Sequence, residues 1–142
     1  MSAELDSLEI PYEQSQAKET LEFGDGEEVE KEFVTTSFSL VTPPRIKASF
    51  THEGLASRVA KLFKKEIQVG DKAFDDVVYI TTDTPAETTA FLKSDDVRTT
   101  ILTAVTEGGN IVIDERDIVA KIPTTGDNDK PLADLVRAVL KA

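Results

Sequence analysis

The sequence predicts an α+β fold, in which an antiparallel β-sheet carries helices packed mainly on one face. Three observations predict it. Short runs of β-branched and aromatic residues punctuate the chain, and apolar residues recur at helical spacing between them. Near the end, two strand-like runs separated by a polar turn precede a final helix, which predicts a C-terminal hairpin and then a helix. At 142 residues, the chain has the usual length of one domain.

Acidic residues are concentrated at the amino-terminal end. Residues 1–32 contain eleven of the 27 acidic side chains and only two lysines, which gives a formal charge of −9 of the total of −11. We expect an acidic, partly disordered leader there, with a short strand near residues 8–12 or 21–23 docked on the body, or else a plain solvated tail. Residues 33–142 are expected to form a single α+β domain.

Strands are expected first in the body. Residues 33–41 are rich in β-branched and aromatic side chains, and residues 45–50 alternate polar and apolar positions. Pro43-Pro44 forces a turn between the two. A short strand is expected at residues 66–69, and the β-branched run at 77–81 is the best candidate for a central strand.

Helices are predicted by apolar spacing and by capping residues. Thr51 is expected to cap a helix that runs to about residue 65. The segment Thr84-Pro85-Ala86-Glu87 matches a capping box with proline at the first helical position, and Ser94 is expected to cap a further helix that ends at Gly108-Gly109.

The last elements are a hairpin and a helix. Residues 111–113 and 118–122 flank a polar turn, which is a hairpin pattern. Residues 131–141 place five branched apolar side chains on one helical face. We expect this face to dock on the sheet of its own chain rather than on a second copy, which favours a monomer over a homodimer.

Few residues could carry chemistry. His52 is the single histidine and cysteine is absent, so thiolate sites and the common zinc sites are excluded. Asp71, Asp75 and Asp76 could hold a hard cation, but they lack the spacing of a calcium loop. The favoured alternative is a glycine turn with Phe74 in the core and aspartates bonded to loop amides. We therefore assign no catalytic, cofactor-binding or metal residue and expect no cofactor, with these three aspartates as the metal candidates.

The segment Glu66-Ile67-Gln68-Val69-Gly70-Asp71-Lys72-Ala73-Phe74-Asp75-Asp76, followed by a strand and by residues 91–98, resembles small uncharacterised bacterial domains. Those domains share the pattern I-x-x-G-D-x-x-F-D, then a strand, a leucine with a short helix, and a hairpin. The resemblance covers about residues 45–123. It implies no activity, because the family has no assigned function.

Charge and hydropathy limit the partners. The negative excess disfavours nucleic acid and anionic membrane surfaces. The first residues lack the features of a secretory signal, and the longest uncharged run, 33–44, is too short and polar to span a bilayer, so a cytoplasmic location is expected. We expect a non-enzymatic protein-binding module that could neutralise a basic partner such as a toxin. The alternative is a small carboxylate-based, cation-dependent hydrolase that uses Asp71, Asp75 and Asp76.

Overall fold

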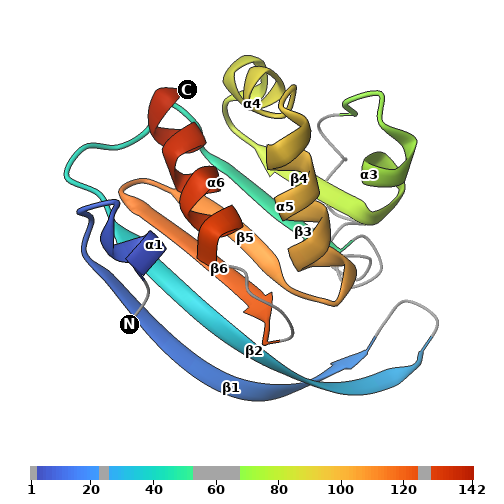
Figure 1. The fold of residues 1–142 in the computed structure, drawn as a ribbon. Helices are drawn as coiled ribbons and strands as arrows, with labels where there is room; N and C mark the ends of the chain where they lie inside the picture. The colour runs from blue at the N-terminus through green and yellow to red at the C-terminus, as the bar shows by residue number, and fades with distance from the viewer. Residues whose placement is uncertain (1–2, 23–25, 53–67, 125–128) are drawn as a thin grey trace.

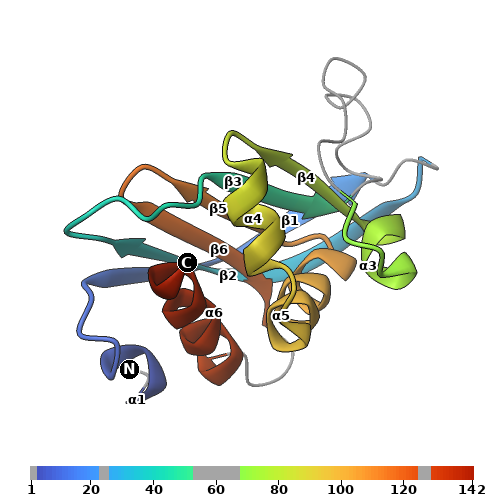
Figure 2. The same cartoon turned by 90° about the horizontal axis from the view of Figure 1, so that it is seen from above.

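A computed structural model describes residues 3–22, 26–52, 68–124 and 129–142. Within these residues, six strands form one antiparallel sheet and the helices pack mainly on one face, as the sequence predicts (Figures 1 and 2). The elements are, in chain order, α1 (Ala3–Asp6), β1 (Tyr12–Glu22), β2 (Glu28–Ser39), β3 (Ala48–His52), α3 (Lys72–Val77), β4 (Val78–Thr82), α4 (Pro85–Phe91), α5 (Asp95–Thr106), β5 (Asn110–Asp114), β6 (Asp117–Pro123) and α6 (Asp129–Lys141). None of the helices described is long and apolar enough to cross a membrane.

The strand order is β1-β2-β6-β5-β3-β4, so β1 and β4 form the two edges of the sheet. β1 and β2 form a long hairpin that extends beyond the rest of the sheet (Figure 1). β5 and β6 form the predicted C-terminal hairpin, in which Asp114 pairs with Asp117 and Glu115 takes a positive φ of 54° in the turn.

The core lies between the sheet and the helices α5 and α6. The ladder registers place five buried side chains in one row across β2, β6, β5, β3 and β4: Thr36, Ala120, Ile111, Phe50 and Ile80. The helices α5 and α6 cover the sheet on this side (Figure 2), and Ile101 and Val136 are among their buried residues. Leu135 of α6 is 1% exposed, so the final helix docks on its own chain, as expected. Burying one such side chain contributes roughly 1.5–3 kcal/mol.

Capping explains where α5 begins and ends. The Ser94 hydroxyl accepts the N–H of Val97, which confirms the predicted cap. After α5, Gly108 takes a φ of 100°, and a Cβ built on Gly109 would overlap the carbonyl oxygen of Lys121 in β6. Only glycine lets the chain pass this close to β6 before β5 begins.

The start of α4 differs in part from its prediction. Pro85 opens the helix and Thr84 stands at the N-cap position, as expected. The Thr84 side chain makes no capping bond, however, and instead accepts the N–H of Lys47 at 2.9 Å. The capping box is therefore replaced by a bond that joins α4 to the start of β3.

The amino-terminal segment carries more regular structure than the sequence predicts. Residues 1–32 contribute α1, all of β1 and the start of β2, so the expected boundary between residues 32 and 33 falls inside a strand. Leu5 is 0% exposed, and Arg137 of α6 donates to the hydroxyl of Ser7 at 2.8 Å beside α1. The length of β1 could not be read from the sequence, because an edge strand with two solvated faces needs no apolar alternation.

The prediction that Thr51 caps a helix is wrong, because Thr51 and His52 are the last residues of β3. In that strand, His52 pairs with Val78 of β4 and is half-buried. The remainder of the expected helix, and part of the strand expected at 66–69, lie outside the described residues.

Candidate functional site

Asp71 is the first of the three aspartates that the sequence singles out. It occupies the N-cap of α3, where its Oδ1 accepts the N–H of Phe74 at 3.3 Å. Its Oδ2 accepts from Nε of Arg98 in α5 at 3.2 Å. Phe74 is 0% exposed, which confirms it as a core anchor. Asp71 therefore joins α3 to α5.

Asp75 and Asp76 also bond within their own neighbourhood. The two carboxylate oxygens of Asp75 accept the N–H groups of Val69 and Gly70, at 2.9 and 3.0 Å. Asp76 lies 3.7 Å from the ammonium of Lys72, one helical turn away. In the part of the chain that the structure describes, no three histidine, aspartate or glutamate side chains are placed to hold a metal ion.

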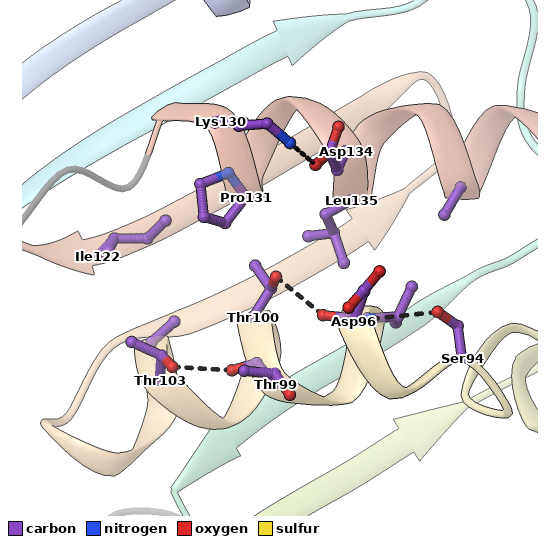
Figure 3. Close-up of a pocket in the computed structure, with 13 residues that line it drawn as sticks. Ser94, Asp96, Thr99, Thr100, Thr103, Ile122, Lys130, Pro131, Asp134 and Leu135 are labelled. Atoms are coloured by element: carbon purple, nitrogen blue, oxygen red, sulfur yellow. Dashed lines mark hydrogen bonds and ion pairs between the residues drawn. The ribbon is translucent and has the colours of Figure 1, made fainter.

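A groove of about 420 Å³ runs between α5 and α6 (Figure 3). Its lining combines apolar side chains with hydroxyls and charged groups. The apolar lining residues are Val97, Ala104, Ile122, Pro131, Leu135 and Ala138, and the polar ones are Ser94, Asp96, Thr99, Thr100, Thr103, Lys130 and Asp134.

Most polar groups of this groove already have partners on their own helix. The hydroxyls of Thr100 and Thr103 donate to backbone carbonyls one turn earlier, at 3.0 and 2.8 Å. Lys130 lies 2.9 Å from Asp134 and, by this hydrogen bond, lowers the pKa of that carboxyl below its ordinary value. A small-molecule site needs polar groups that converge on the ligand, and these groups turn toward their own helices instead.

Negative charge gathers on the β1–β2 hairpin. Glu28, Glu30 and Glu32 occupy alternate positions of β2, so they share one face of the strand. Glu32 accepts a hydrogen bond from the side-chain amide of Gln16 in β1. Glu28 and Glu30 are exposed, and neither forms an ion pair within the described residues. Lys18, which pairs in register with Glu32, is the only base of β1.

Two other bases near the hairpin, Lys121 and Lys31, already form ion pairs. Lys121 of β6 lies 2.6 Å from the Glu19 carboxylate and 5.0 Å from the centre of the Phe33 ring. Phe33 is 1% exposed. It is buried although the odd-numbered residues of β2 lie on the face of the sheet that points away from the helices. Lys31 lies 3.9 Å from Glu107. Within the described residues, Glu28 and Glu30 are therefore exposed carboxylates of the hairpin that form no ion pair, as is Glu13 of β1.

Comparisons with known proteins place few constraints on function. No family model matches the chain, and no curated protein matches it. Among solved structures, the chain is similar to the crystal structure of the mycobacterial trehalose monomycolate transport factor A, TtfA. The two share 13% identity over 96% of this chain and 92% of the other, with a TM-score of 0.44.

The sequence reasoning missed the hairpin itself. β1 reads Tyr-Glu-Gln-Ser-Gln-Ala-Lys-Glu-Thr-Leu-Glu and lacks the apolar alternation of a half-buried strand. The available signal was the Gly-Asp-Gly turn sequence at 24–26 between two segments of strand length. Read as a hairpin turn, it would have paired residues 12–22 with 28–38.

Proposed function

We propose that this protein is a protein-binding module that recognises a basic partner through the acidic β1–β2 hairpin. The observation that carries the proposal is the row Glu28, Glu30 and Glu32, which shares one face of β2 and is met in register by a single lysine, Lys18. Carboxylates left exposed beside one another attract a cationic surface and accelerate its encounter.

The rest of the chain supports this choice of surface. The total formal charge is −11, and residues 1–32 supply −9 of it. Residues 12–32, which span β1 and the start of β2, carry eight acidic and two basic side chains, a formal charge of −6, and β1 lies at the edge of the sheet opposite to β4 (Figure 1). No comparable observation supports the alternative of a cation-dependent hydrolase, because the carboxylates of Asp71 and Asp75 accept hydrogen bonds from backbone amides around α3.

Calorimetric titration with a defined basic peptide tests the proposal. The probe is an extended peptide of about ten residues that alternates lysine and threonine, compared with its glutamate–threonine counterpart. The lysine peptide should bind, more weakly as salt rises, and the glutamate peptide should not. The double variant Glu28→Gln/Glu30→Gln should weaken binding by roughly five-fold, since exposed ion pairs contribute modestly.

The matched control removes the same charge elsewhere. Glu87 in α4 and Asp96 in α5 are exposed, so Glu87→Gln/Asp96→Asn changes the net charge equally without touching the hairpin. This variant should bind the lysine peptide as the parent does. Equal weakening by both double variants, or no binding of the lysine peptide to the parent, would refute recognition through the hairpin.

A further inference from the structure

Among the strands that the structure describes, β1 has no neighbouring strand on its outer side. It is the first strand in the sheet order and pairs only with β2 among the strands of the described residues. Figure 1 shows β1 along the outside of the sheet, with β2 on its inner side. An edge of this kind presents backbone donors and acceptors that can pair with another strand.

The alternation of hydrogen-bonded pairs along the β1–β2 ladder shows which backbone groups of β1 point outward. The N–H of Ser39 donates to the carbonyl of Pro11 at 3.0 Å, so the pair Pro11–Ser39 is hydrogen-bonded. Bonded and non-bonded pairs alternate along an antiparallel ladder, so the odd-numbered residues of β1 bond to β2. The even-numbered residues from Gln14 onward turn their N–H and C=O groups to the outer edge: Gln14, Gln16, Lys18, Thr20 and Glu22.

The hydrogen bonds between β2 and its other neighbour, β6, agree with this alternation. The N–H of Leu40 donates to the carbonyl of Arg116 at 2.7 Å, and the N–H of Thr124 donates to the carbonyl of Glu32 at 3.1 Å. Even-numbered residues of β2 therefore bond to β6, which leaves its odd-numbered residues to bond to β1.

β1 also lacks two of the devices that protect many edge strands, a proline and a bulge. No proline interrupts Tyr12–Glu22, and its register with β2 advances residue for residue through eleven pairs without a bulge. The other edge strand, β4, is only five residues long. β1 is thus the longer of the two edges and offers more backbone groups for pairing.

We propose that β1 binds an extended, lysine- or arginine-bearing segment of its partner by strand addition. This inference rests on the proposed function and specifies how the partner binds. Charge selects the occupant: β1 contains three glutamates and one lysine, and β2 beside it contains three glutamates and one lysine. A second copy would bring the same acidic hairpin against itself, whereas a basic strand would place cations beside Glu13 and near Glu30.

Proline substitution at an outward-facing position tests strand addition. Gln16→Pro removes one outward N–H but no bond of the ladder to β2, so an edge strand should tolerate it. Gln16→Ala is the matched control, because it removes the same side chain and keeps the N–H. Gln16→Ala should bind the lysine–threonine peptide with an affinity within about two-fold of the parent chain. Gln16→Pro should bind the same peptide at least roughly ten-fold more weakly than the parent chain.

A second measurement covers the case in which the proline variant is unfolded. Hydrogen exchange of the parent chain, followed by NMR with and without the peptide, should show new protection at the amides of Gln14, Gln16 and Lys18. Unchanged exchange there, or equal binding by folded Gln16→Pro, would overturn strand addition. Charge-dependent binding would persist in that case, so the proposed function would stand. A parent dimer that dissociates in Gln16→Pro would instead make a second copy the occupant and would also overturn the inference.

Discussion

Lys121 and Glu19 form an ion pair across β2, with 2.6 Å between the ammonium and the carboxylate. The same ammonium lies 5.0 Å from the ring centre of Phe33, so its side chain covers the aromatic ring on one side. β1 is thereby tied to β6, two strands away in the sheet.

A double-mutant cycle measures the interaction energy between Lys121 and Glu19. Glu19→Gln and Lys121→Met should each destabilise the fold modestly, with a coupling energy of about 0.5–1 kcal/mol, because the pair is partly exposed and screened by water. Lys121→Ala should cost more than Lys121→Met, since it also uncovers Phe33. Urea unfolding followed by circular dichroism provides the free energies. Full additivity of Glu19→Gln and Lys121→Met would show that the contact contributes nothing.

The segment around α3 should depend on Phe74 more than on its charges. Phe74→Ala should cost about 3–5 kcal/mol, because the ring is fully buried. Asp75→Ala should cost about 1–2 kcal/mol, since it leaves two loop N–H groups without their acceptor. Asp76→Ala should fall within about 0.5 kcal/mol, because its pair with Lys72 is exposed. A rise in melting temperature with Mg²⁺ or Ca²⁺ that Asp75→Ala abolishes would show instead that these aspartates bind a metal.

The amino-terminal segment should be required for stability. Leu5→Ala should cost about 2–5 kcal/mol, because the side chain is fully buried against the core, whereas exposed Glu4→Gln should change little. A chain that begins at Phe33 loses α1, β1 and the start of β2 and should fail to fold as a monomer. If that shortened chain melted within a few degrees of the parent, the segment would be dispensable, as its composition alone suggests.

Lys47 should stabilise the fold in a pH-dependent way. Its ammonium lies 3.5 Å from Asp114, 3.5 Å from Glu115 and 3.7 Å from Asp83, and the charge of Asp114 is the main cause that raises its pKa above 10.5. Because the folded pKa is raised, this stabilisation is complete below the ordinary pKa of lysine and is lost as pH rises through the folded value.

The measurement is the melting temperature of Lys47→Met against pH. The variant should melt below the parent at pH 7, and the difference should shrink as pH rises above 10.5. Lys93→Met removes an exposed lysine in the loop before α5 and serves as the control, with little effect at any pH. A difference that stays constant through this range would show that Lys47 acts through packing and not through its charge.

The body of the fold could be predicted because its elements bury one side. Apolar residues point toward one core in three segments: residues 33–41, the hairpin at 111–122 and one face of α6. Burial of one side of a strand or helix makes apolar residues recur in the sequence with a period of 2 or 3.6. Ser94 was predictable as a cap because the cap bond is local.

The hairpin and its edge could not be predicted in the same way. β1 is stabilised by backbone pairing to β2 and by single contacts such as Lys121–Glu19, which join residues about a hundred positions apart. Neither leaves a periodic pattern in the sequence. The acidic composition of residues 1–32 identified the charged surface but suggested a solvated leader, because it gives no information about strand pairing.

Amide hydrogen exchange of the free protein, measured by NMR, tests most directly whether β1 is a strand with an open outer edge. The amides of Ser15, Ala17 and Glu19, which face β2, should exchange roughly 100-fold more slowly than those of Gln14, Gln16 and Lys18, which face outward. Fast exchange at all six would show that β1 does not pair with β2. Slow exchange at all six would show that the outer edge is already occupied and is not available to a partner.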